Sequence, residues 1–139
     1  AFGGLEHISS TALMFSRNDL PNLSNPLKMT DGYQVFLSLC SHEFFHTWHV
    51  KRIKPQELFD APLDQEQYTE QLWIYEGFTS YYDDFSLLRC SVISQQEYLK
   101  VAGQNLTRLI RNKGRFKQTI TESSFDAWTK FYKQDESAV

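Results

Sequence analysis

The sequence predicts a mainly α-helical domain with one short strand at its start. Two long segments carry apolar residues at intervals of three and four, and two further segments follow helix-capping signals. The 139 residues suffice for one domain with a single core. Hydrophobic residues make up 41% of the chain and aromatic residues 15%, which indicates an ordered globular structure.

The N-terminal part is expected to be extended and then irregular. Residues 1–7 are glycine-rich and predict a short strand at the start of the domain. Residues 8–32 are rich in Ser, Asn and Pro and contain the chain breakers Asn25-Pro26 and Asp31-Gly32, so they predict a long loop.

The first helix is predicted over residues 33–51, because apolar spacing at three and four runs through this segment and a proline follows it. The basic residues Lys51, Arg52 and Lys54 are interpreted as the cationic C-terminal end of this helix, where positive charge complements the helix dipole. A second loop is expected over residues 54–67.

Three further helices are predicted in the second half of the chain. Residues 68–89 carry apolar side chains on nearly all sides, as expected of a mostly buried helix. Ser94 forms a capping box with Glu97 ahead of an amphipathic third helix. Ser123 and Asp126 repeat this signal in weaker form and predict a fourth helix after them.

His42-Glu43-Phe44-Phe45-His46 is an H-E-x-x-H motif within the first predicted helix. Residues four apart lie on one helix face, so the imidazoles of His42 and His46 can bind one metal ion. Zinc lowers the pKa of the water that it binds to roughly 7, so Glu43, which flanks the open position, can act as a general base. The same pattern also fits a core helix with two hydrogen-bonded histidines.

The third ligand decides the class of site, because a catalytic zinc takes three protein ligands and leaves a fourth position for water. A metzincin would place a further histidine six residues after His46, where this chain has Arg52. Glu76 lies in the predicted buried helix, where a carboxylate must be paired or bound to a cation. A salt bridge to a lysine or arginine is the alternative for Glu76. The pattern predicts one Zn²⁺ per chain, bound by His42, His46 and Glu76 as in a gluzincin.

Other residues are candidates for supporting roles. His49, one turn beyond His46, is assigned to the outer shell or the substrate side of the site, with an ordinary helix-end histidine as the alternative. Asp83 is the candidate acceptor for a ligand histidine, since zinc ligands need such partners. The donor that stabilises a reaction oxyanion is expected among Tyr81, Tyr82 and Tyr132, or beyond Val139, in which case the isolated fragment would be inactive.

Five segments of the chain form a set that spans nearly its whole length. They are Gly3-Gly4-Leu5-Glu6-His7, His42-Glu43-Phe44-Phe45-His46-Thr47-Trp48, Lys51-Arg52-Ile53-Lys54-Pro55, Leu72-Trp73-Ile74-Tyr75-Glu76-Gly77-Phe78-Thr79-Ser80-Tyr81-Tyr82 and Ser123-Ser124-Phe125-Asp126-Ala127-Trp128. Together these segments resemble the glycyl aminopeptidase family. The resemblance implies a gluzincin with a thermolysin-like catalytic domain, within a larger protein that has a β-rich N-terminal region and often a C-terminal PDZ domain. Residues 1–139 would then be a single catalytic-domain fragment of that protein.

The first of these segments looks like the exopeptidase motif of related zinc aminopeptidases. By that resemblance, Gly3 and Gly4 lie in an edge strand that aligns the substrate backbone, and Glu6 binds the terminal ammonium of the peptide. An edge strand can pair with an extended peptide, and a fixed carboxylate favours a cation at its end. A glycine-rich turn with a solvated glutamate is the alternative.

These patterns predict metal-dependent peptide hydrolysis, and the resemblance implies release of small N-terminal residues such as glycine. The competing hypothesis is a binding module, but a structural zinc site is usually closed by four ligands and rich in cysteine. With 14 basic and 17 acidic residues, the chain lacks the charge expected of a nucleic-acid-binding protein, and no apolar run is long enough to cross a membrane. Cys40 and Cys90 do not indicate a disulfide scaffold, and cytoplasm and bacterial periplasm both remain compatible with the sequence.

Overall fold

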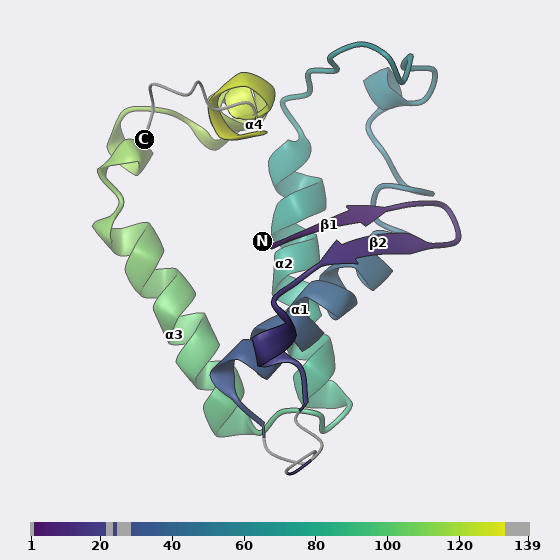
Figure 1. Cartoon of the computed structure of the whole chain (residues 1–139). Coiled ribbons are helices and arrows are strands. Elements are labelled where there is room, and N and C mark those ends of the chain that lie inside the picture. Colours follow the sequence, from purple (N-terminus) through teal and green to yellow (C-terminus); the bar gives the residue numbers. More distant parts are fainter. Residues whose placement is uncertain (1, 22–23, 25–28, 133–139) are drawn as a thin grey trace.

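The computed structural model describes residues 2–21, 24 and 29–132, which form four α-helices and a two-stranded sheet (Figure 1). The mainly helical prediction is therefore confirmed. In chain order the helices are α1 (Asp31–Phe45), α2 (Leu72–Arg89), α3 (Gln95–Arg111) and α4 (Ile120–Ala127). Among the described residues, none of the helices combines the length and the apolar character needed to cross a bilayer.

The strand predicted at the start of the chain is present, and it has a partner that was not predicted. β1 (Gly3–Glu6) pairs antiparallel with β2 (Thr11–Met14) over all four residues. β2 is exposed throughout, so its sequence lacks the alternation that marks a half-buried strand. The prediction of a loop over residues 8–32 is therefore wrong for the residues of β2. The predicted chain breaker Asn25-Pro26 lies outside the described residues.

α1 begins near the predicted position but ends earlier than expected. Thr30 caps it, since the Thr30 Oγ1 accepts a hydrogen bond from the Tyr33 N–H at 3.1 Å. The helix ends at Phe45, and the chain then makes an irregular turn in which Val50 adopts a φ of 145°. Because an α-helix cannot pass through that backbone conformation, the predicted extension to Lys51 is wrong. The basic cluster lies in this turn and does not form a helix end.

α3 follows the sequence-based prediction, and α2 ends at the predicted Arg89 but begins at Leu72, later than the predicted residue 68. α2 begins at Leu72, where the N–H of Trp73 donates to the Oγ of Ser124, a residue of α4, at 3.0 Å. α3 begins after the predicted capping box of Ser94 and Glu97. The N-terminus of α2 is thus held by a side chain from another helix, which no local signal in the sequence indicates.

α4 is present, but a different signal starts it. Its N-terminal capping box is formed by Thr119 and Glu122, so the weaker signal at Ser123 and Asp126 does not begin the helix. The prediction of a fourth helix is confirmed, and its predicted start is wrong. A short π-helical turn, Trp128–Tyr132, continues the chain after α4.

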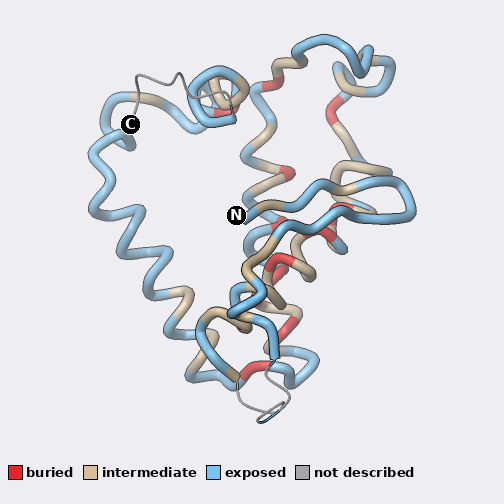
Figure 2. The backbone as a smooth tube through the Cα atoms, in the orientation of Figure 1, coloured by how far each residue is buried: buried red, intermediate tan, exposed pale blue. Residues whose placement is uncertain are grey.

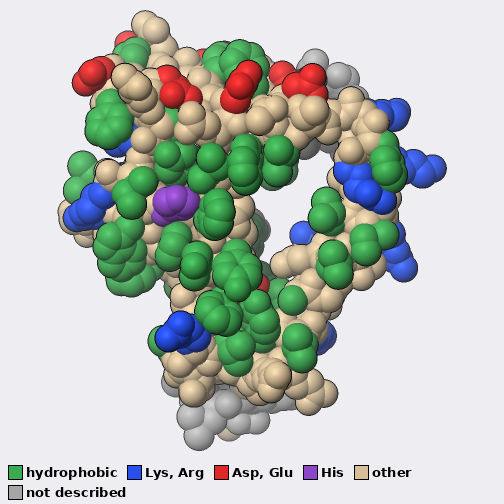
Figure 3. Space-filling model, turned by 180° about the vertical axis from the view of Figure 1, so that it is seen from behind, with side chains coloured by type: hydrophobic (Ala, Val, Ile, Leu, Met, Phe, Trp, Pro, Cys, Tyr) green, Lys and Arg blue, Asp and Glu red, His purple; other side chains and the backbone are tan. Residues whose placement is uncertain are grey.

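Burial is concentrated on α1, on α2 and on the turn that leads into α3 (Figure 2). Among the described residues, the buried hydrophobic side chains are Leu39, Pro55, Tyr75, Leu87 and Ile93. The buried polar ones are Gln34, Glu43, His46, Thr69, Thr79, Asp83, Asp84 and Ser124. α3 contains no buried residue, and hydrophobic side chains lie on both sides of the opening between α3 and the rest of the molecule (Figure 3). Buried polar groups need partners, so the α1–α2 interface is where a functional site is expected.

Candidate metal centre

His42 of α1, His46 at the C-terminal cap of α1 and Glu76 of α2 converge at this interface. The Nε2 atoms of His42 and His46 are 3.1 Å apart, and their rings meet edge to face. The Oε2 of Glu76 lies 3.2 Å from the Nε2 of His42 and 3.7 Å from that of His46. Two imidazole nitrogens and one carboxylate oxygen that face one point form a donor set suited to a zinc ion.

Asp83 meets the other nitrogen of His42. The Oδ2 of Asp83 lies 3.1 Å from the His42 Nδ1, and Asp83 is buried. Burial lowers the pKa of His42, but its hydrogen bonds to Asp83 and Glu76 and the charges of these carboxylates outweigh that effect and raise the pKa to about 10. Asp83 is therefore in the position that the predicted hydrogen-bond acceptor of His42 requires. The Nε2 of His42 remains directed at Glu76.

The second nitrogen of His46 is held by the backbone. Its Nδ1 lies 2.8 Å from the carbonyl oxygen of His49, which can only accept a hydrogen bond. The Nδ1 therefore carries the proton, and the Nε2 keeps its lone pair for a metal ion. The His49 ring packs against Phe45, Tyr75 and Phe78, and burial together with the charge of His46 lowers its pKa. His49 thus contacts the His46 ring through its carbonyl group, and the role predicted for His49 stays a prediction.

Glu43 is buried beside the three proposed metal ligands. Its Oε2 has no hydrogen-bonding partner among the described residues. Burial raises the pKa of Glu43, although the two neighbouring histidines oppose this. Gly4 of β1 passes so close that a Cβ on it would lie 2.1 Å from the Glu43 Oε1. A free carboxylate beside the ligand atoms is well placed to act as a base.

Glu6 joins the site from the end of β1. Its carboxylate, the Glu43 carboxylate and a ring nitrogen of His46 all lie within 4.8 Å of one another. The Lys51 Nζ lies 3.1 Å from the Glu6 Oε1, and both side chains are partly exposed. Glu6 is therefore not the solvated glutamate of the alternative interpretation. Gly3 differs from its neighbour, because a Cβ there would meet only the Met14 side chain, at 3.9 Å.

Of the three tyrosines proposed as oxyanion donors, Tyr132 is the one influenced by the site. Loss of hydration raises the pKa of Tyr132 to about 12, and the negative charges of the three site glutamates add to this effect, although the residue keeps 57% of its surface exposed. The phenol therefore lies within electrostatic range of these carboxylates and is protonated at neutral pH. Tyr81 stacks on Phe85 and Tyr82 stacks on Phe45, so these two rings are engaged in aromatic contacts.

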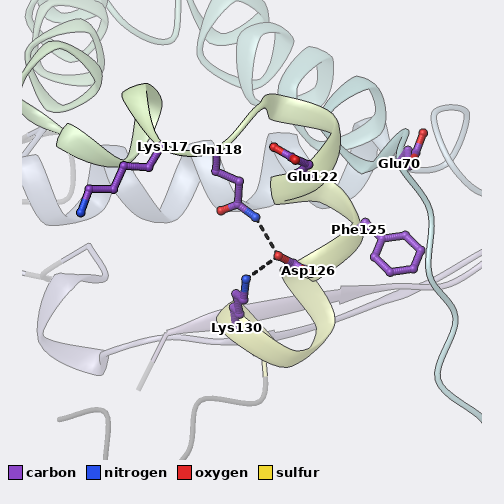
Figure 4. A pocket seen from close by; sticks show the side chains of 7 residues that line it. All are labelled: Glu70, Lys117, Gln118, Glu122, Phe125, Asp126 and Lys130. Carbon is purple, nitrogen blue, oxygen red and sulfur yellow. Dashed lines mark hydrogen bonds and ion pairs between the residues drawn. The ribbon is translucent and has the colours of Figure 1, made fainter.

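A separate pocket of about 510 Å³ lies beside α4 and contains none of the predicted site residues (Figure 4). Its lining consists of Glu70, Lys117, Gln118, Glu122, Phe125, Asp126 and Lys130. The Oδ2 of Asp126 accepts hydrogen bonds from Gln118 and Lys130, and Glu122 caps α4. Asp126, Gln118, Lys130 and Glu122 thus have structural partners within this pocket and around it.

Comparison with known proteins identifies relatives of the chain. The model of the M61 glycyl aminopeptidase family matches residues 35–139. The crystal structure of an aminopeptidase N family protein from Idiomarina loihiensis matches with a TM-score of 0.91 and 52% sequence identity. That match covers 99% of this chain and 23% of the other chain, so the present chain spans less than a quarter of its neighbour's length. No curated protein matches the chain.

Proposed function

The chain belongs to the M61 glycyl aminopeptidase family, and we propose that it carries the catalytic centre of a zinc-dependent peptidase. The observation that supports this proposal most directly is the convergence of His42, His46 and Glu76 beside the buried Glu43, whose Oε2 has no hydrogen-bonding partner among the described residues. Two histidines on one helix and a glutamate on the next are the ligand order of a gluzincin with a thermolysin-like domain. When bound, zinc supplies a Lewis acid and lowers the pKa of water.

The remaining residues would prepare and assist the attack of water on the peptide carbonyl. Glu43 takes the proton of the attacking water and passes it to the leaving amine. Its pKa, raised by burial, favours this uptake of a proton. Asp83 and the carbonyl of His49 hold the two imidazoles in the orientation that a metal ion requires. The protonated Tyr132 donates a hydrogen bond to the oxyanion.

The position of β1 supports an aminopeptidase rather than an endopeptidase. Glu6 lies next to Glu43 and His46, so a peptide whose first carbonyl group reached the metal centre would bring its terminal ammonium towards Glu6. β1 would align the first residues of the substrate, with Gly4 leaving room for the Glu43 carboxylate. We propose that small N-terminal residues such as glycine are released, as the family name indicates.

Metal analysis of the full-length protein tests the ligand assignment. One zinc ion per chain is expected, and Glu76→Gln should lose the ion to a chelator that leaves the parent loaded. Glu70→Gln is the matched control, because Glu70 is exposed and two residues before α2. Full zinc occupancy of Glu76→Gln under the same competition would contradict the proposed ligand set.

Selectivity for a free amine tests the assignment of Glu6. The parent enzyme should hydrolyse a glycyl reporter much faster than the same reporter with its amine acetylated. Glu6→Ala should lose at least about tenfold of this preference, equivalent to about 1.4 kcal/mol, because a charge-assisted hydrogen bond is removed. If Glu6→Ala and the parent show the same preference, Glu6 does not bind the substrate's amine.

A further inference from the structure

Three glutamates lie around His46, and two of them, Glu6 and Glu43, approach each other. Glu6 and Glu43 both lie within 4.8 Å of the same His46 nitrogen, and Glu76 lies 3.7 Å from the Nε2 of His46. Like charges at such distances repel each other, so a carboxylate on a strand end will turn away unless something holds it. In the part of the chain that the structure describes, the lysine or arginine that forms an ion pair with one of these glutamates is Lys51.

Lys51 is tied to the metal centre at both its main chain and its side chain. Its backbone N–H donates to the carbonyl oxygen of His46 at 3.1 Å, in the irregular turn after α1. Its Nζ lies 3.1 Å from the Oε1 of Glu6. Lys51 therefore connects a proposed metal ligand on α1 with the proposed amine-binding residue on β1. The early end of α1 makes this connection possible, because a continued helix would carry Lys51 in another direction.

We propose that Lys51 is a positioning residue that fixes the Glu6 carboxylate for recognition of the substrate's terminal ammonium. The inference rests on the proposed aminopeptidase function. A carboxylate can accept hydrogen bonds at both oxygens, so Lys51 on the Oε1 leaves the Oε2 for the substrate. Lys51 also offsets the repulsion between Glu6 and the neighbouring glutamates. Loss of Lys51 should weaken binding of free amines while the hydrolytic groups stay in place.

Kinetics of the full-length enzyme test this role. Lys51→Met should lower the preference for a free over an acetylated glycyl reporter by about three- to fivefold, the size expected of a partly exposed ion pair. The change should appear in KM rather than in kcat, and Lys51→Arg should restore most of the preference. Lys54→Met is the matched control, because the Lys54 ammonium lies over the Phe59 ring. An equal loss in Lys54→Met would overturn the proposal.

A double-mutant cycle and a binding measurement separate this role from a general structural one. In a Glu6→Gln background, Lys51→Met should change the preference by less than about twofold, because its effect passes through Glu6. In a Glu43→Gln background, in which turnover is expected to be strongly slowed, calorimetry should show that Lys51→Met weakens binding of a glycyl peptide but not of its acetylated form. Additive effects in the cycle, or equal weakening for both peptides, would overturn the role of Lys51.

Failure of the underlying function gives a different result. A parent enzyme that hydrolyses free and acetylated reporters equally well would overturn the aminopeptidase assignment, and the role of Lys51 with it. A parent enzyme with a strong preference that Lys51→Met leaves unchanged would overturn the role of Lys51 alone.

Discussion

The α1–α2 pair and α3 use their side chains in opposite ways. α1 and α2 bury charged and polar groups, including Glu43 and Asp83, which are 7% and 8% exposed. α3 has a clear apolar stripe, yet its large apolar residues Leu99, Leu106, Leu109 and Ile110 are all more than half exposed. Amphipathic periodicity in a helix therefore indicates an apolar face that could pack against another element, but it does not show that the face is buried. A buried polar group indicates where the chain holds chemically reactive residues.

The contacts of the two regions explain this difference. α1 and α2 lie against each other, and Ser38 and Ser41 of α1 donate hydrogen bonds to Asp84 and to the carbonyl group of Asp83. α3 contacts the rest of the chain near its N-terminus, through the ring of Tyr98 and the ion pair of Lys100 with Asp31. Substitutions in the α1–α2 region should therefore alter function or stability strongly, whereas substitutions on α3 should have little effect on this chain.

The largest expected effect is that of Glu43→Gln. A glutamine of the same shape cannot accept the proton, so kcat should fall by about 10²- to 10⁴-fold, while zinc content should stay that of the parent. Steady-state kinetics combined with metal analysis separate the two roles, with Glu70→Gln as the exposed control. Near-normal turnover in the Glu43→Gln enzyme would rule out the general-base role.

The next largest effect is expected for the partner of His42. Asp83→Asn should weaken zinc affinity by about 10- to 100-fold, because the carboxylate that orients the imidazole is lost. Asp84→Asn is the matched control, since Asp84 is equally buried but contacts Ser38 instead of a histidine. Titration with a competing chelator measures both variants. Equal losses in the two variants would show that Asp83 acts through general stability.

A smaller effect on turnover is expected when Gly4 of β1 is replaced by alanine, which adds one methyl group. In Gly4→Ala, the added Cβ would overlap the Glu43 carboxylate, so the strand or the base must move and turnover should fall by about tenfold. Gly3→Ala is the control, because its Cβ meets a flexible methionine at an ordinary contact distance. Zinc content should be unchanged in both. Unaltered turnover in Gly4→Ala would mean that β1 lies further from Glu43 in solution.

The features that could be predicted from the sequence are those with local causes. The capping box at Ser94 starts α3, and the spacing of His42 and His46 brings both imidazoles to one side of α1. Glu76 could be selected because a mid-helix carboxylate among apolar neighbours needs a partner. Each of these signals lies within a few residues of the structure that it determines.

The features that could not be predicted depend on contacts between distant segments. α1 ends where the carbonyl of His49 turns back to the His46 ring, and this overrides a spacing that would otherwise continue the helix. The ion pair of Lys51 with Glu6 joins two segments that share no sequence pattern. The charges of the site glutamates raise the pKa of Tyr132, in the turn after α4, and neither segment indicates this effect alone.

The smallest expected effect is that of Leu106→Ala, and its comparison with Leu39→Ala tests the contrast between the two regions directly. Leu39 in α1 is 7% exposed and Leu106 in α3 is 57% exposed, so the same substitution removes very different amounts of buried surface. Leu39→Ala should lower the free energy of unfolding of the 139-residue chain by about 2–5 kcal/mol, because it leaves a cavity. Leu106→Ala should change it by less than about 0.5 kcal/mol, since an exposed helical leucine gives up little packing and alanine is the better helix former. Urea unfolding followed by circular dichroism measures both variants. A cost of more than about 1 kcal/mol for Leu106→Ala would mean that the apolar stripe of α3 is covered in solution, and the contrast between the two regions would then be wrong.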